Sequence, residues 1–126
     1  FNTPEDNYYE YRRLWSRVAA NISQIGKPVV LCGCGIPEQF ENIPERELFT
    51  EIHYVAIVSD NKIFENRMRE GRNVTDENWI KSSLSFNTWL KENATTTKPS
   101  MTLIDNSNLT PNETAEQIDT WIRKFL

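Results

Sequence analysis

The sequence predicts an α/β protein with a three-layer arrangement, in which helices flank a parallel sheet. Three short runs that are almost wholly apolar, residues 29–31, 52–58 and 101–105, alternate with helical patterns. An apolar run of this kind is typical of a strand buried on both faces of a parallel sheet, and the alternation favours βαβ units with right-handed crossovers. Three strands make a narrow sheet, so we expect further strands from sequence outside this chain or from a partner chain.

Length and composition indicate a single domain over residues 1–126. The chain is 38% hydrophobic and 25% charged, as in an ordinary globular protein. Its net charge of -4 gives no basic field to attract nucleic acid or an anionic membrane surface. No apolar run approaches the roughly 20 residues of a membrane span. We therefore expect neither nucleic acid nor a membrane as a partner.

The cysteines favour a cytoplasmic location. Cys32 and Cys34 are the two cysteines of the chain, and free thiols persist in a reducing compartment. The first residues show no basic and then apolar leader. Several Asn-X-Ser/Thr triplets occur, but the sequence is rich in these residue types, so we interpret the triplets as coincidental.

The first helix is predicted from a cap at Thr3, with Pro4 at the first helical position, to a stop at Gly26. Apolar residues recur along it at three- and four-residue steps, which predicts one face toward the core. These residues are Tyr8, Tyr11, Trp15, Val18, Ile22 and Ile25.

Helices are also predicted after each strand. Residues 37–49 could form two short helices, Asp60 caps a helix that ends near Gly71, and Asp76 opens the next one. That next helix carries one mostly apolar face, formed by Trp79, Ile80, Ser83, Leu84, Asn87 and Leu90.

The closing helix begins with a capping box, in which Thr110 is followed three residues later by Glu113. Pro111 stands at its first helical position, where a proline is favourable. Its inner side is expected to consist of Ala115, Ile118, Trp121, Ile122 and Phe125.

Gly33, Cys34 and Gly35 follow the first strand and are candidates for a substrate-binding loop. Glycine allows a sharp turn and the close approach of a ligand, and ligands bind beyond the carboxyl ends of strands in open α/β sheets. A tight turn that buries two small side chains explains the same residues equally well. The single histidine, His53, lies in the second strand pattern, so neither a Cys–His nucleophile nor a metal site is predicted.

Arg67, Arg69 and Arg72 precede a polar segment, which suggests a mobile lid over residues 67–78. The planar fork of donors in arginine suits phosphate oxygens. Arg67 and Arg69 cannot face the same way on a helix, so only one or two of the three would reach a ligand. A solvated helix end, where cations offset the dipole, is the alternative that spacing alone favours.

Asp105 and Asn106 end the third strand and carry hydrogen-bonding groups that could contact a nucleobase. A turn that leads to the next helix cap explains them as well. The sequence alone leaves both interpretations open.

Together these segments resemble the later two-thirds of a small P-loop kinase of the shikimate, gluconate and adenylate kinase type. Residues 29–35 are similar to the strand and glycine-rich substrate loop of that family, and residues 52–72 to its strand, helix and arginine-bearing lid. Residues 103–107 look like its last strand and adenine-side loop. The resemblance implies a P-loop NTPase-like fold without its first strand or strands, and phosphoryl transfer from a nucleotide to a small molecule. It implies catalytic roles for Arg67 and Arg72, substrate binding by Gly33, Cys34 and Gly35, and nucleotide binding by Arg69, Asp105 and Asn106.

The Gly-x-x-x-x-Gly-Lys-Ser/Thr loop that defines this family does not occur in the sequence. In the family this loop precedes every segment matched here, so we expect the chain to be the later part of a longer enzyme. That parent would use ATP and Mg²⁺, whereas this chain alone is expected to be inactive and to bind no cofactor.

Two other classes of protein are compatible with the pattern. One is a non-catalytic α/β binding or assembly module that completes its sheet with a partner, as a homodimer or by strand exchange through an open edge. The other is a Rossmann-like or flavodoxin-like cofactor domain. It is less favoured, because no Gly-x-Gly-x-x-Gly follows a strand.

Overall fold

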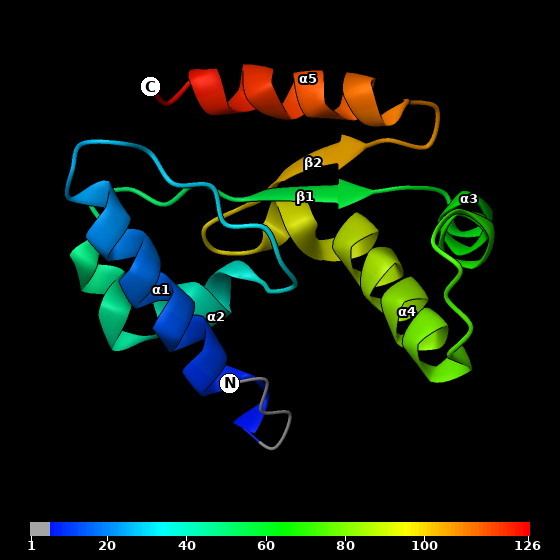
Figure 1. The fold of residues 1–126 in the computed structure, drawn as a ribbon, viewed down its shortest axis with the longest axis horizontal. Coiled ribbons are helices and arrows are strands. Elements are labelled where there is room, and N and C mark those ends of the chain that lie inside the picture. Colours follow the sequence, from blue (N-terminus) through cyan, green and yellow to red (C-terminus); the bar gives the residue numbers. More distant parts are fainter. Residues whose placement is uncertain (1–5) are drawn as a thin grey trace. The chain divides into compact units, whose positions relative to one another are not determined.

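The chain divides into two compact units, Phe1–His53 and Tyr54–Leu126. Its structure is a computed structural model that describes residues 6–126 (Figure 1). The predicted helix start at Thr3 and Pro4 lies outside these residues. Each unit is described by itself below.

The first unit is helical. It contains α1 (Tyr9–Ser23), the short helix α2 (Pro37–Glu41) and the 3-10 helix η2 (Pro44–Leu48). The predicted strand at residues 29–31 is wrong, because this segment forms no strand. Its side chains are exposed, with 60% of the Val30 surface accessible. A strand is stable only when another strand pairs with it, and the sheet within the described residues consists of β1 (Val55–Val58) and β2 (Thr102–Asp105) alone.

The small side chains of α1 are the buried ones. Ser16, Ala19 and Ala20 are buried, and they allow α1 to approach η2 closely. The predicted core-facing stripe is wrong as well, since its members are largely exposed and lie beside the packed face. They are Tyr8, Tyr11, Trp15, Val18, Ile22 and Ile25.

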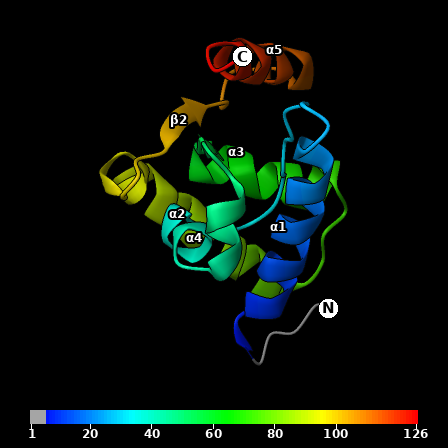
Figure 2. The same cartoon turned by 90° about the vertical axis from the view of Figure 1, so that its left-hand side faces the viewer.

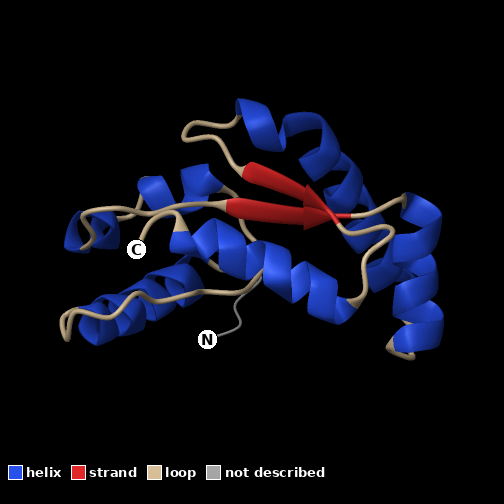
Figure 3. Cartoon of the chain, turned by 90° about the horizontal axis from the view of Figure 1, so that it is seen from above, coloured by secondary structure: helices blue, strands red, loops and turns tan. Residues whose placement is uncertain are grey.

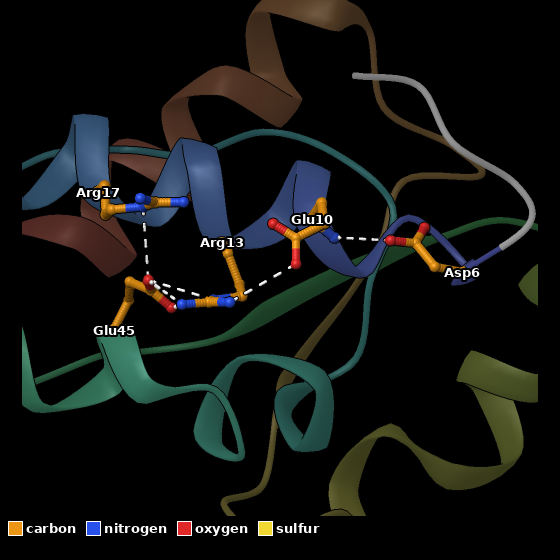
Figure 4. Close-up of polar contacts among 5 residues, drawn as sticks. All are labelled: Asp6, Glu10, Arg13, Arg17 and Glu45. Atoms are coloured by element: carbon orange, nitrogen blue, oxygen red, sulfur yellow. Dashed lines mark hydrogen bonds and ion pairs between the residues drawn. The ribbon is translucent and has the colours of Figure 1, made fainter.

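A buried carboxylate joins α1 to η2 (Figure 4). Arg13 donates through Nε to Glu45 Oε1 at 2.9 Å and through Nη2 to Oε2 at 3.2 Å. Arg17 adds an ion pair at 3.4 Å, and Glu10 lies 3.5 Å from Arg13. The hydrogen bonds from Arg13 hold the pKa of Glu45 below its usual value, although burial opposes this. Glu45 is therefore ionised at neutral pH and fastens the two elements.

The second unit holds the sheet. Strand β1 (Val55–Val58) is followed by α3 (Asn61–Asn66), the π-helical turn η3 (Arg67–Gly71), α4 (Glu77–Asn93) and the short η4 (Ala94–Thr96). Strand β2 (Thr102–Asp105) and helix α5 (Pro111–Arg123) complete it. The two strands run parallel, in register from Val55 beside Thr102 to Val58 beside Asp105 (Figure 3).

The predicted fold class is therefore wrong. The structure shows a mixed α/β chain with a two-stranded parallel sheet, and not a three-layer P-loop NTPase-like sheet. The parallel orientation of β1 and β2 is confirmed. Both strands are shorter than predicted, because residues 52–54 and Met101 precede the paired region.

Two apolar clusters form the core of the second unit. One packs α4 against the sheet and contains Ala56, Val58, Leu90, Ala94 and Met101. The other joins η3 to the start of α4 and contains Met68, Val74 and Ile80. Helix α5 lies on the other side of the strands from α4 (Figures 1 and 2), where Trp121 Nε1 donates to Thr102 Oγ1 at 3.0 Å.

The predicted helix caps at Asp60, Asp76 and Thr110 are confirmed. Asp60 accepts from the backbone N–H groups of Lys62 and Ile63, and Asp76 caps α4 in the same way. Thr110 and Glu113 form the reciprocal capping box at the start of α5. The predicted inner side of α5 is only partly covered, because Ala115 and Phe125 are exposed and Ile118, Trp121 and Ile122 are half-buried. None of the helices within residues 6–126 combines the length and apolar character needed to cross a lipid bilayer.

Candidate functional site

The carboxyl ends of β1 and β2 lie side by side and open into two polar loops. Asn106 N donates to Val58 O at 2.8 Å, which extends the strand pairing by one residue. Asp60 N donates to Ser107 Oγ at 2.8 Å, which joins the loop after β1 to the loop after β2. Because ligands of open α/β sheets bind beyond this end of the strands, this edge is the candidate site.

Asn87 of α4 holds the loop after β1 in place. Its amide nitrogen donates to Ser59 O at 2.8 Å and to Asn61 Oδ1 at 2.8 Å, while Asn87 Oδ1 accepts from Ser59 N at 3.2 Å. Lys91 Nζ also donates to Asn61 Oδ1, at 3.2 Å. Asn87 is only 2% exposed, so these bonds satisfy backbone groups that water does not reach. The sequence analysis did not assign Asn87 to the site. The feature that could have indicated it is a polar amide on a mostly apolar helix face.

The loop after β2 is organised around Asp105. Its Oδ1 accepts from Ser107 N at 2.9 Å and from Ser107 Oγ at 2.5 Å. The hydrogen bond from the Ser107 hydroxyl lowers the pKa of Asp105 most, followed by the bond from the Ser107 backbone. The positive charge of Lys91 lowers it further, whereas burial raises it. A lowered pKa means that these bonds stabilise the fold above the ordinary carboxyl range and are lost only as the pH falls through the lowered value. Asp105 is thus an ionised hydrogen-bond acceptor at neutral pH.

The structure brings two of the predicted site residues together, Arg67 and Asn106. Arg67 Nη1 donates to Asn106 Oδ1 at 3.0 Å, and Nη2 donates to Asn106 O at 3.0 Å. Nη2 also reaches the carbonyls of Ser107 at 3.2 Å and Leu109 at 3.4 Å. The guanidinium of Arg67 therefore forms its hydrogen bonds with the loop after β2 and holds that loop in position.

The charge of Arg69 is balanced by two carboxylates. Its Nε lies 2.8 Å from Glu65 Oε2, and its two Nη atoms lie 2.6 and 2.9 Å from the oxygens of Glu77. The bonds to Glu77 and then to Glu65 raise the pKa of Arg69, and the same contact lowers the pKa of Glu77. Because Glu65 and Glu77 neutralise the charge of Arg69, this residue is poorly suited to bind a phosphate.

Arg72 is placed differently. Its guanidinium carbon lies 5.7 Å from the ring centroid of Trp79, which is within cation–π distance. In residues 6–126 no carboxylate forms an ion pair with Arg72. Of the three predicted phosphate ligands, Arg72 is the one whose charge is available.

The segment predicted as a lid, residues 67–78, is anchored at two points. Met68 and Val74 are buried in the cluster with Ile80. Between them η3 ends at Gly71, and Asn73 adopts a left-handed backbone with φ 54°. Motion of this segment stays a prediction.

Gly33, Cys34 and Gly35 belong to the first unit, in a segment without regular structure. Both thiols of the chain, Cys32 and Cys34, are free and exposed. A Cβ at Gly35 would lie 2.7 Å from Phe40 Cε2, so a side chain here requires the ring to shift, whereas Gly33 has open space. Substrate binding by this loop stays a prediction.

Two open cavities lie in the second unit, and the second of them reaches the loop after β2 at Leu109. One of about 630 Å³ borders Arg69 and its carboxylate partners, and one of about 480 Å³ separates β2 from α5. Among the residues that the structure describes, no group of three or more His, Cys, Asp or Glu side chains could hold a metal ion.

Compared with protein-family models, curated proteins and solved structures, the chain shows no significant match. The functional argument therefore rests on the geometry of the strand ends.

Proposed function

We propose that the chain contributes the nucleotide-binding edge of a phosphotransferase that acts on a small molecule. The observation that carries the proposal is the contact between Arg67 and Asn106, 39 residues apart in the sequence, where two parallel strands end. Loops held this firmly beyond parallel strands are a common place for a nucleotide to bind. The resemblance to small-molecule kinases points to the same residues.

Each residue at this edge has a role in the proposal. The ionised Asp105 accepts hydrogen bonds from a ribose hydroxyl or a base amino group, since its pKa is lowered. Arg67 holds the loop at the geometry that the base requires. Arg72, which follows η3 and lies over Trp79, is proposed to supply positive charge to a phosphate that extends from this edge. Phosphoryl transfer depends mainly on positioning and charge stabilisation, and these are the roles that the proposal assigns to Arg67 and Arg72.

The residues at this edge do not form a Mg²⁺ site by themselves. Asp60 already caps α3 with its carboxylate, and only Oδ2 of Asp105 is left for a ligand, because Oδ1 accepts both bonds from Ser107. Mg²⁺ requires oxygen ligands in octahedral geometry, so we assign it no ligand here. The phosphate cradle and the metal ligands would come from other sequence.

We also place the protein in the cytoplasm. The support is that the thiols of Cys32 and Cys34 are both free and exposed, and exposed thiols stay reduced in a cytosolic environment. The nucleotide pools that such an enzyme needs are available there.

The proposal is tested by titrating ATP into the full-length protein by calorimetry. Arg72→Ala is expected to weaken binding by about tenfold or more, because a charge-assisted hydrogen bond contributes about 1.5–3 kcal/mol. Arg123→Ala is the matched control: Arg123 is an exposed arginine of α5, paired with Asp119 outside the site. The affinity of Arg123→Ala for ATP should equal that of the wild-type protein. The proposal would be refuted if the wild-type protein did not bind ATP, or if Arg72→Ala bound ATP as tightly as the wild-type protein.

A further inference from the structure

One edge of β1 has no neighbouring strand among the described residues. Tyr54 O accepts from Thr102 N at 2.9 Å and Val58 O accepts from Asn106 N at 2.8 Å, so these carbonyls point toward β2. Backbone groups alternate in direction along a strand. The groups of Val55 and Ile57 therefore face the opposite edge, where they form a template for another strand.

This edge lacks the devices that usually protect an exposed strand. β1 reads Val-Ala-Ile-Val, without a charged residue or a proline, and Ile57 is 38% exposed. Natural edge strands are commonly blocked by charges, prolines or bulges. Helix α5, on the same side of the sheet as Ile57, leaves Phe125 exposed and Trp121 half-buried. The second unit thus presents an apolar strand edge beside an incompletely covered helix.

The first unit contains a segment of matching character. Residues 28–31 read Pro-Val-Val-Leu, without a charge, and Val29, Val30 and Leu31 are all exposed. The segment has the length of β1 and forms no strand of its own. An exposed apolar run with unpaired backbone is what a free strand edge accepts in strand addition.

We propose that residues 28–31 of one copy pair with the free edge of β1 in a second copy. Each copy carries both the segment and the edge, so the proposed exchange is reciprocal and the proposed assembly is a two-fold dimer. Neither surface carries a charge, so their contact desolvates no ionised group. Each sheet would gain a third strand, which is the number usually needed for independent stability. The inference does not depend on nucleotide binding.

The mass of the chain in solution tests the proposal. Sedimentation equilibrium over a range of concentrations should show a dimer that dissociates on dilution. Val30→Lys should weaken the dimer at least tenfold, because it places a charge in the paired strand; Val30 is already exposed, so the variant should fold. Leu48→Lys is the matched control, since Leu48 is 56% exposed on η2 of the same unit. A wild-type monomer at every concentration, or equal weakening by Leu48→Lys, would overturn the proposal.

A mixing experiment tests which surfaces meet. Val30→Glu and Ile57→Lys should each dimerise poorly alone, because both strand contacts of each homodimer carry a charge. Mixed together they should form a heterodimer, in which one contact is unmodified and the other pairs Glu with Lys. A mixture no more dimeric than the separate variants would show that residues 28–31 do not contact β1.

Discussion

Replacing Asn87 by alanine is expected to lower the free energy of unfolding of the second unit by about 3 kcal/mol. The substitution removes both partners of the buried Ser59 backbone, whose N–H and C=O bond to the amide of Asn87. Each buried polar group left unsatisfied costs about 1–3 kcal/mol. The loss would be measured by urea denaturation.

Ser85→Ala is the control for this prediction. Ser85 is exposed on α4, two residues before Asn87, and alanine there is expected to change the stability by less than about 0.5 kcal/mol. If Asn87→Ala were as stable as Ser85→Ala, Asn87 would not be what holds the loop after β1.

Ile80→Ala is expected to destabilise the second unit by a similar amount, about 3 kcal/mol. Ile80 is 1% exposed and packs with Met68 and Val74. Truncation leaves a cavity as well as losing buried apolar surface, and such substitutions cost about 2–5 kcal/mol. Urea denaturation would measure this loss too.

A graded series makes the Ile80 prediction specific. Ile80→Val should cost about 1 kcal/mol, since it removes one methyl group. Ile22→Ala, at an exposed position of α1, should cost less than either. Equal stability of Ile80→Ala and Ile22→Ala would contradict the packing of η3 against the start of α4.

The elements that depend on local chemistry could be predicted from the sequence. The caps at Asp60, Asp76 and Thr110 were found because a capping side chain bonds to backbone only two or three residues away. The parallel pair of β1 and β2 was found because both strands are apolar and a helical crossover separates them.

The incorrect predictions concern features that depend on distant neighbours. Residues 29–31 have the composition of a strand, but a strand exists only where another strand pairs with it. The apolar stripe of α1 was expected in the core, yet the small Ser16, Ala19 and Ala20 allow closer packing on the adjoining face. Periodicity identifies an amphipathic helix but does not show which side a partner covers.

The candidate site was partly predictable for the same reasons. Asp105 and Asn106 could be placed at a strand end, and Arg67 on the helix predicted from Asp60 to near Gly71. The contact between Arg67 and Asn106 depends on the loop conformation. Arg69 was grouped with Arg67 and Arg72 by charge. The structure pairs it with Glu65, four residues earlier, and with Glu77, across the η3 turn. The role of Asn87 was missed because its partners lie 26 and 28 residues away.

Hydrogen–deuterium exchange of the full-length protein, with and without ATP, tests most directly whether the strand ends bind a nucleotide. ATP should slow exchange in residues 59–61 and 105–109, the two loops beyond β1 and β2, and leave α1 unchanged. If ATP binds while those loops exchange at the same rate as before, the nucleotide site lies elsewhere and the functional account is wrong.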